Sequence, residues 1–558
     1  MYKIKTNLFY ALCLLVGIGA FTACSDDKTD PSTNPKGNIS GVTDQKLTDI
    51  QVVDSGSISW HDHYTGMLKQ AQQANGEEDS LLVAYATRQL EEVDSLEAAY
   101  KNSFGAKGQQ SGVTRGWGGK DSFFGYKYVV LKYKTIDKDG KPIECSELVA
   151  APYRYHYYFY ERIRPHNLII GCHATITSDA QCPSNNQSSL TDVGMLISHA
   201  RMNLQTGVNQ NLVIIPDYQG YGATRKDAHP YLSQDLTARQ VLDGVIAGKM
   251  WYDKWGGIPD AALEEGFKTL VVGYSQGGSV AMAVQRYIEK NNLSETLNFA
   301  GSICGNGPYD PVATLKAYIA DDKIYMPVAA ALIIKGMCDA APGVAGQYSP
   351  SDYLAEGFLK SGILDWISSK DYKGDEIQEK LLAYALSNDN GFVMMRKDDT
   401  SNEFLPYITS NQQTADGKKR KWASVPLGAS CYCTVSQVLR PEVIEYFKNG
   451  SVETQYMAKM IAIQDALEKN NLTQGWLPQH PIFVFHSEAD EVVPFVNYQN
   501  AELAFSQTGY FRGIILKDSS ATHKNSGSMF YLVKEGSYFK SILSNTWKQD
   551  FPNNSKYE

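Results

Sequence analysis

Short apolar runs that alternate with helical stretches constrain the fold of this chain more than any other feature. The runs are mostly β-branched or rich in leucine, as buried parallel strands are. They lie at residues 167–171, 212–215, 269–272, 297–303, 481–485 and 513–516. Helical patterns separate them, and the one that begins at Thr237 opens with a capping-box sequence. The alternation predicts an α/β fold, with a mostly parallel central sheet that carries helices on both faces.

One long interruption breaks this alternation. Between residues 305 and 475 the strand signal nearly vanishes, and mixed helical patterns fill the segment before the next run. A connection between neighbouring strands needs far fewer residues, so the segment is predicted to be a helical lid inserted into the fold. Ahead of the first run, residues 126–133 and 144–150 flank an Asp-Gly pair that ends at Gly140, which predicts a β-hairpin.

The pattern divides the chain into six predicted parts. Residues 59–100 repeat apolar side chains at three- and four-residue steps, which predicts helix before the sheet begins. The parts are a signal peptide (1–23), a lipidated flexible tether (24–50), an N-terminal helical segment (51–122), the first part of the core (123–304), the lid insertion (305–475) and the second part of the core (476–558).

The N-terminus has the pattern of an export signal. Lys3 and Lys5 precede an apolar run that is too short for a transmembrane helix, which needs ~20 residues. Cys24 follows two small residues, which resembles a bacterial lipobox, and the acidic residues after it resemble the surface-export signal of Bacteroidetes lipoproteins. We therefore expect an extracytoplasmic lipoprotein, held at the outer membrane or cell surface by lipid on Cys24. The alternative is an ordinary cleaved signal that leaves Cys24 as a free thiol.

Composition and cysteine spacing argue against nucleic acid and metal ions as partners. The formal charge is -9, only 20% of the residues are charged, and no basic stripe is present, so nucleic acid is not an expected partner. The nine cysteines do not show the spacing of a zinc site, since Cys431 and Cys433 are too close for the usual knuckle. No metal and no cofactor are expected.

The segment Gly273-Tyr274-Ser275-Gln276-Gly277 matches the pattern GxSxG. The pattern alone is weak, because a chain of this length has roughly one chance in four of containing it. Here an apolar run precedes it directly and an amphipathic helical pattern follows it, as a nucleophile elbow requires. Ser275 is therefore the predicted nucleophile. The alternative is a glycine-rich turn with an incidental serine.

The partners of such a serine should follow in the order acid, then histidine. Asp490 lies in the loop after the run at 481–485, and His523, the last histidine, lies in the loop after 513–516. A serine hydroxyl needs a neutral imidazole to take its proton, and the imidazole needs a carboxylate to fix its tautomer. Ser275, Asp490 and His523 are thus a predicted triad. Glu488 and Glu491 are expected to face the solvent, because their longer side chains have an extra rotor to freeze.

Three further stretches resemble the secretory lipase family of α/β-hydrolases. They are Gly171-Cys-His-Ala-Thr175, Gln181-Cys-Pro-Ser184 and Pro216-Asp-Tyr-Gln-Gly-Tyr-Gly222 with the later Val241-Leu-Asp243. With the elbow and the two loops, the resemblance covers about residues 125–545. It implies an α/β-hydrolase fold, a large helical lid, no metal and activity on acyl esters. The chain departs from the family at Ala174, where the family has glycine, and at Ser487, which follows His486 in place of glycine.

The resemblance also implies an oxyanion hole. One donor is the backbone N–H of Gln276, and the second is that of Ala174 or Thr175. His173 is expected to shape this loop by hydrogen bonding, and Asp217 to cap its own turn. Cys172 and Cys182 bracket the loop, and they could form a disulfide or remain buried thiols.

The resulting hypothesis is a secreted serine hydrolase of acyl esters, a lipase or esterase that acts through the triad and an acyl-enzyme. Its substrate would be an ester of a lipid or an acylated glycan. The aromatic run at residues 153–160 keeps a carbohydrate esterase open, one that removes acetyl or aromatic acyl groups, although packing also explains the run. A serine peptidase would need a clamp for a peptide terminus that we do not find. A catalytically inactive binding lipoprotein is disfavoured by the intact spacing of the triad.

Overall fold

The computed structural model describes residues 41–73, 80–108, 124–156, 159–162, 164–186, 192–201, 211–254, 262–387, 391–408, 417, 419–423 and 427–557. The predicted signal peptide, Cys24 and most of the tether lie outside the described residues, as do Tyr157 and Tyr158 of the aromatic run. None of the helices in these ranges combines the length and the apolar character that a membrane span requires.

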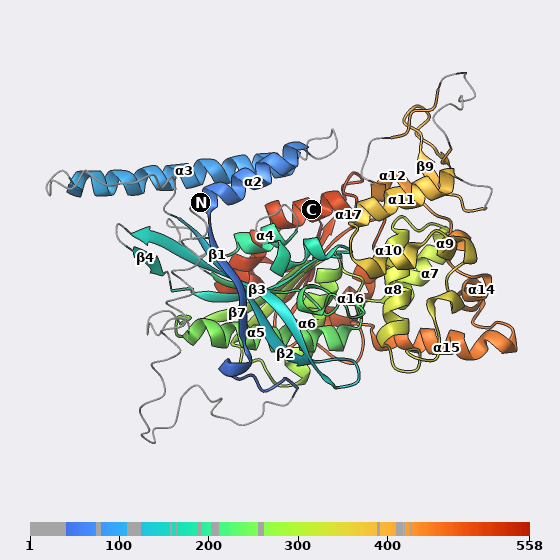
Figure 1. Ribbon diagram of the computed structural model, residues 1–558, viewed down its shortest axis with the longest axis horizontal. Coiled ribbons are helices and arrows are strands. Elements are labelled where there is room, and N and C mark those ends of the chain that lie inside the picture. Colours follow the sequence, from blue (N-terminus) through green and yellow to red (C-terminus); the bar gives the residue numbers. More distant parts are fainter. Residues whose placement is uncertain are drawn as a thin grey trace. The chain divides into compact units, whose positions relative to one another are not determined.

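An eleven-stranded sheet forms the centre of the described chain (Figure 1). Its strands, in spatial order, are β1 (Gln51–Ser59), β2 (Phe124–Ile136), β3 (Pro142–His156), β6 (Asn211–Pro216), β5 (Asn167–Cys172), β7 (Lys268–Tyr274), β8 (Phe299–Gly305), β12 (Ile482–Ser487), β13 (Phe511–Leu516) and β14 (Ser555–Tyr557), with β4 (Phe159–Arg162) beside β3. The strands from β1 to β6 pair antiparallel, and those from β6 to β14 pair parallel. Every residue of β6, β12 and β13 is buried, as in a sheet that is covered on both faces.

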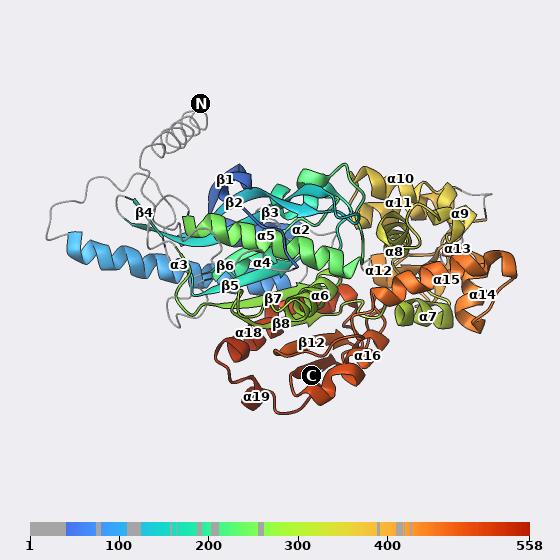
Figure 2. The ribbon, with the colours of Figure 1, turned by 90° about the horizontal axis from the view of Figure 1, so that it is seen from below.

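Helices cover both faces of this sheet (Figures 1 and 2). One face carries α5 (Gln234–Lys254) and α6 (Gln276–Lys290), and the other carries α2 (Trp60–Gln73), α3 (Ser80–Gly108), α4 (Asp192–Ser198) and α18 (Glu535–Leu543). The C-terminal part adds α16 (Val496–Phe505), α17 (His523–Met529) and α19 (Trp547–Asp550). The predicted α/β architecture is therefore confirmed.

The N-terminal segment differs from the prediction at its start. Residues 51–59 were expected to be helical, but they form β1 at the edge of the sheet, antiparallel to β2. This stretch contains valine, isoleucine, serine and glycine, which are weak helix formers, and the open edge of β2 offers backbone partners. The helical prediction was wrong for these nine residues. The helices predicted from the periodicity begin afterwards, with α2.

The predicted β-hairpin is present as β2 and β3. The turn between them is closed by backbone hydrogen bonds from Asp137 to Lys141 (2.9 Å) and from Gly140 to Asp137 (3.0 Å). Gly140 has a φ of 75°, a conformation that glycine adopts without strain.

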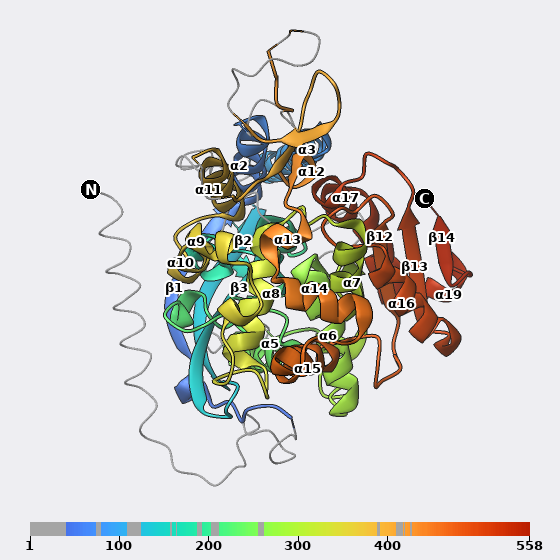
Figure 3. The same ribbon diagram turned by 90° about the vertical axis from the view of Figure 1, so that its right-hand side faces the viewer.

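Helices fill most of the chain between β8 and β12 (Figure 3). They are α7 (Pro311–Asp321), α8 (Pro327–Ala340), α9 (Glu356–Lys360), α10 (Ile363–Ser369), α11 (Gly374–Leu386), α12 (Leu427–Ser430), α13 (Val435–Val438), α14 (Pro441–Asn449) and α15 (Thr454–Lys469). A small sheet of β10 (Phe404–Pro406), β9 (Met395–Lys397) and β11 (Cys431–Tyr432), which the sequence did not predict, lies among them. The segment has its own buried cluster, to which the described core adds only Tyr231 and Leu232.

Polar contacts fasten this inserted segment to loops of the core. Lys370 Nζ donates hydrogen bonds to the carbonyl oxygens of Arg225 (2.6 Å) and Asp227 (2.5 Å). Thr177 Oγ1 donates to the carbonyl oxygen of Tyr372 (2.7 Å). The segment therefore lies against the loops that follow β5 and β6.

Candidate active site

Ser275 stands in a sharp turn between β7 and α6. Its φ of 59° is in the left-handed region, and its N–H donates to the carbonyl oxygen of Gly305 (2.9 Å). A Cβ added at Gly277 would lie 2.0 Å from the carbonyl oxygen of Cys172, and one at Gly273 would lie 2.3 Å from that of Gly277. Both positions require glycine, because the strand, the turn and the helix approach too closely for a side chain. This strand, turn and helix form the geometry of a nucleophile elbow.

The structure brings Ser275, Asp490 and His523 together. His523 Nε2 lies 2.9 Å from Ser275 Oγ, and His523 Nδ1 lies 2.6 Å from Asp490 Oδ2. Asp490 follows β12, and His523 begins α17 after β13, so the three side chains come from the carboxyl edge of parallel strands. The hydroxyl, imidazole and carboxylate form a continuous hydrogen-bonded chain. Such a chain can activate a serine as a nucleophile.

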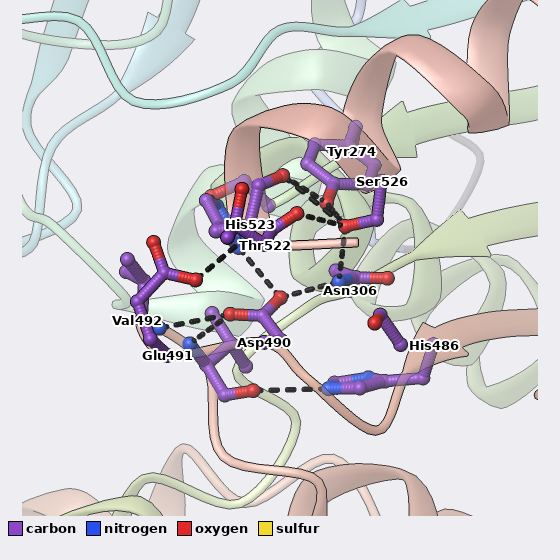
Figure 4. Close-up of polar contacts among 12 residues, drawn as sticks. Tyr274, Asn306, His486, Asp490, Glu491, Val492, Thr522, His523 and Ser526 are labelled. Atoms are coloured by element: carbon purple, nitrogen blue, oxygen red, sulfur yellow. Dashed lines mark hydrogen bonds and ion pairs between the residues drawn. The ribbon is translucent and has the colours of Figure 1, made fainter. Parts of the chain in front are cut away.

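Four hydrogen bonds hold the Asp490 carboxylate (Figure 4). Oδ1 accepts the N–H groups of Val492 (2.9 Å) and Val493 (2.7 Å), and Oδ2 accepts from Asn306 Nδ2 as well as from His523. Burial acts to raise the pKa of Asp490, but the charge and hydrogen bond of His523 outweigh it and hold the pKa below its ordinary value. The carboxylate is therefore charged at neutral pH.

Asn306 is a member of this site that sequence reasoning missed. It directly follows β8, and its Nδ2 donates to Asp490 Oδ2 and to Ser526 Oγ (3.1 Å). It is a polar residue between two glycines at the end of a core strand, and this position was the available signal. Asn306 restricts the rotation of the acid by bonding the oxygen that also faces His523.

His523 is held by its main chain as well as by its ring. Its carbonyl oxygen accepts a hydrogen bond from the Tyr274 hydroxyl (2.7 Å), and its N–H donates to Glu491 Oε2 (2.8 Å). Burial acts to lower the pKa of His523, but the charge and hydrogen bond of Asp490 and the charge of Glu491 raise it above its ordinary value. The ring must be neutral to accept the proton of Ser275, so activity is expected to fall as the pH drops through this pKa.

The two glutamates beside Asp490 differ from one another. Glu488 is exposed, as expected. Glu491 was also expected to face the solvent, and this prediction was wrong, since its side chain is half-buried and bonded to the backbone of His523. The reason is that α17 begins beside the acid loop, so the start of the helix supplies a donor that a solvent-facing carboxylate would not have.

Gln276 lies at the first position of α6, where the helix has no acceptor for its N–H. No hydrogen bond within the described residues uses this N–H. The side chain is buried, and its Nε2 donates to His229 Nε2 (3.1 Å), while His229 Nδ1 donates to the carbonyl oxygen of Gln219 (2.7 Å). Burial lowers the pKa of His229 to about 3, so this ring is neutral and fixes the side chain of Gln276.

The two candidates for a second donor are not equivalent. The Ala174 N–H donates to Asp192 Oδ2, so a carboxylate already occupies it. The N–H of Thr175 has no partner among the described residues, and its Oγ1 lies 2.8 Å from the Tyr231 hydroxyl. The expectation that Ala174 offers a free donor is therefore not met in this structure. Asp192, eighteen residues along the chain, holds that amide.

His173 shapes the same loop. Its ring stacks on Tyr218 with the centroids 4.0 Å apart, and its nitrogens lie 2.7 Å from the carbonyl oxygen of Ala174 and 3.2 Å from that of Asp217. The buried Asp217 carboxylate accepts the N–H of Ser184 (2.8 Å). Hydrogen bonds thus join the three stretches that resemble the lipase family into one support for the loop after β5.

The described residues contain neither a disulfide nor a metal-binding cluster. The seven described cysteines, Cys172 and Cys182 included, are buried, and no disulfide joins any two of them. No group of three or more His, Cys, Asp or Glu side chains in these ranges could hold a metal ion. A cavity of about 810 Å³ lies at the opposite, amino edge of the strands, beside Lys268, Phe299 and Tyr510, and so belongs to a different part of the molecule.

A family model matches part of the chain. The family described as secretory lipase matches residues 424–527, a segment that contains Asp490 and His523. The resemblance predicted from the sequence is confirmed for this segment. No curated protein matches the chain in sequence.

Solved structures share the fold of most of the chain. The ligand-bound form of the rice cell wall degrading esterase LipA from Xanthomonas oryzae is 17% identical with a TM-score of 0.53, and the match covers 90% of this chain and 98% of that chain. A putative hydrolase from Legionella pneumophila subsp. pneumophila is 15% identical with a TM-score of 0.54, and the match covers 88% of this chain and 98% of that chain. The chain has the predicted α/β-hydrolase fold.

Proposed function

We propose that this chain is a secreted serine hydrolase that cleaves acyl esters, as lipases and esterases do, through Ser275, Asp490 and His523. The hydrogen-bonded chain from Ser275 Oγ through the imidazole to the Asp490 carboxylate carries the proposal. The match of residues 424–527 to the secretory lipase family supports it. No cofactor takes part in this mechanism.

The reaction proceeds in two acyl transfers. Ser275 Oγ attacks the ester carbonyl while His523 Nε2 takes its proton, and the resulting imidazolium returns that proton to the leaving alcohol. Water, activated by the same nitrogen, then hydrolyses the acyl-enzyme. Asp490 accepts the Nδ1–H of His523 throughout, so that Nε2 faces the serine and the imidazolium is stabilised.

The negative charge on the tetrahedral intermediate needs two backbone donors. We propose the N–H of Gln276 and that of Thr175, because no described group uses either. Each such donor contributes ~3 to 4 kcal/mol, because it acts on charge that appears only in the transition state. The Ala174 N–H would serve only if the Asp192 carboxylate released it.

The segment from 305 to 475 is proposed as the lid over the acyl site. Its contacts with the acid loop support this role, since the Tyr318 hydroxyl donates to the carbonyl oxygen of Val492. Gly428 of α12 also lies against Glu491. A wall of this kind would enclose the acyl part of a substrate beside the nucleophile.

We also propose export of the chain as an extracytoplasmic lipoprotein. Residues 1–23 would be removed as a signal peptide, and lipid on Cys24 would hold the enzyme at the outer membrane or cell surface. The family of secretory lipases agrees with export. Membrane contact would then be through the anchor, with the tether ahead of the folded chain.

A carbohydrate esterase remains the second candidate. The fold neighbour LipA is titled a rice cell wall degrading esterase, which makes an acylated glycan a substrate worth testing. Against this, Tyr153 of the aromatic run is buried between strands, which favours a packing role for that residue. Acyl-chain preference separates the two candidates.

Hydrolysis of nitrophenyl esters is expected to become more efficient as the acyl chain lengthens. A lid that buries the chain contributes ~0.8 kcal/mol per methylene, which is about fourfold in kcat/KM for each added carbon until the pocket is full. A panel from acetyl to palmitoyl, run beside acetylated and aromatic-acylated glycans with Ser275→Ala as the blank, measures this. A preference for acetyl with no gain beyond it would favour the carbohydrate esterase instead.

A further inference from the structure

We propose that Glu491 is a positioning residue, which fixes the main chain of His523 and places a second negative charge beside its imidazole. This inference rests on the proposed serine mechanism and deepens it. The three carboxylates of the acid loop then divide their roles. Asp490 bonds the ring of His523, Glu491 bonds its backbone, and Glu488 faces the solvent.

The backbone contact replaces a local helix cap. His523 is the first residue of α17, and the residue before it, Thr522, makes no capping hydrogen bond with its side chain. The first N–H groups of a helix lack partners within the helix. Glu491 Oε2 satisfies that of His523 at 2.8 Å from a different loop. The loop that supplies the acid therefore also sets where α17 begins.

Two adjacent residues thus hold one histidine at two points. Asp490 Oδ2 lies 2.6 Å from ring Nδ1, and Glu491 Oε2 lies 2.8 Å from the backbone nitrogen. The Tyr274 hydroxyl holds the carbonyl oxygen of the same residue. With the main chain fixed on both sides of Cα, the imidazole loses the freedom that would move Nε2 away from Ser275 Oγ.

Glu491 is partly covered, and no described lysine or arginine pairs with it. A Cβ added at Gly428 would lie 3.4 Å from Glu491 Oε1, so the inserted segment partly covers the carboxylate. No lysine or arginine in the described ranges forms an ion pair with it. The cation that Glu491 would face is the imidazolium that forms during the reaction, when His523 holds the proton of Ser275.

Among the described residues, five titratable groups interact electrostatically with Glu491. They are Asp490, His523 and Tyr274 of the core, and Tyr318 and Tyr325 of the inserted segment. Burial and the charge of Asp490 raise the pKa of Glu491. The charge of Glu491 in turn contributes to the raised pKa of His523, after burial and Asp490.

Glu491→Gln is the informative variant, because an amide oxygen can still accept the His523 N–H while the charge is lost. We expect kcat to fall on the order of tenfold with KM unchanged. A hydrogen bond to a charged acceptor is stronger than one to a neutral acceptor by an energy that corresponds to about this factor. The acid limb of the kcat/KM profile should move to lower pH, because the imidazole loses a neighbouring negative charge. Glu491→Ala, which also removes the acceptor, should lose about a hundredfold.

Glu488→Gln is the matched control, since it removes the same charge from an exposed position in the same loop. It should change kcat less than twofold and leave the acid limb in place. The inference is overturned if Glu491→Gln behaves like Glu488→Gln, or if its kcat falls while the acid limb stays where it is. Ser275→Ala, assayed alongside, must be inactive. If it is active, the serine mechanism itself fails, whatever the Glu491 variants do.

Discussion

Replacing Ser275 with alanine is expected to lower the turnover of a nitrophenyl ester by about 10⁶-fold, as the loss of the nucleophile does in comparable triads. The effect is large because, among the described residues, the Ser275 hydroxyl is the one that bonds His523 Nε2, at 2.9 Å. Ser275 also follows directly on β7. The oxyanion donors and the binding surface would remain, and they alone account for the residual rate.

The same variant should fold normally. Alanine and serine both carry a Cβ, so the strain of the left-handed φ at position 275 is unchanged. The melting temperature and circular dichroism of Ser275→Ala should therefore match those of the unmodified protein. Retention of more than a few per cent of the activity, in a folded variant, is incompatible with Ser275 as the nucleophile.

Asp490→Asn is expected to lower turnover by about 10⁴-fold while the fold is preserved, by analogy with other triads. The Asp490 carboxylate accepts hydrogen bonds on both oxygens, from Asn306 and His523 on one and from Val492 and Val493 on the other. An amide cannot accept on both sides. Its NH₂ group would face a donor, and the imidazole would be left in the wrong tautomer.

Steady-state kinetics on Asp490→Asn and Glu488→Gln side by side provide the measurement. Glu488→Gln should differ from the unmodified protein by less than about twofold. The pKa of Asp490 is held low by His523, so the acid limb of the rate profile should report His523 and not the acid. A collapse of activity in Glu488→Gln with Asp490→Asn unaffected would refute the assignment of the acid.

Patterns of neighbouring residues were enough to predict the buried strands and the turn that carries Ser275. The buried parallel strands appear as continuous apolar runs, and β5, β6, β7, β8, β12 and β13 each include most of the run predicted for them. The glycines around Ser275 could be predicted from the tight approach that an elbow requires, and the structure has those approaches at Gly273 and Gly277. The expected chain order of serine, acid and histidine pointed to the two loops that contain Asp490 and His523, which lie beside Ser275 in the structure.

Contacts between distant segments account for what the sequence did not reveal. The Ala174 amide appears free in the sequence, because nothing near it signals that Asp192 accepts its hydrogen bond. Glu491 appears solvent-facing for the same reason, since its donor lies thirty-two residues away at the start of α17. Strand β1 depends on the open edge of β2, a partner that periodicity within residues 51–59 cannot show.

The sequence indicates the length of the inserted segment but not its small sheet or its attachment to the core. Its length between two core strands is visible in the sequence, whereas the sheet of β9, β10 and β11 is built from strands of two or three residues. Such strands are too short for a period-two pattern to emerge. The attachment of the segment through Lys370 likewise uses backbone carbonyl oxygens, which leave no trace in the residue types of their partners.

Covalent labelling with a fluorophosphonate tests the central claim most directly, because the reagent reacts readily with a serine hydroxyl that a neighbouring base activates and only slowly with an ordinary one. Mass spectrometry of the digested protein should find one adduct per chain, on the peptide that contains Ser275, formed at a rate that falls sharply in His523→Ala. An enzyme that hydrolyses esters without an adduct on Ser275, or that carries the adduct on another residue, would contradict the proposed mechanism.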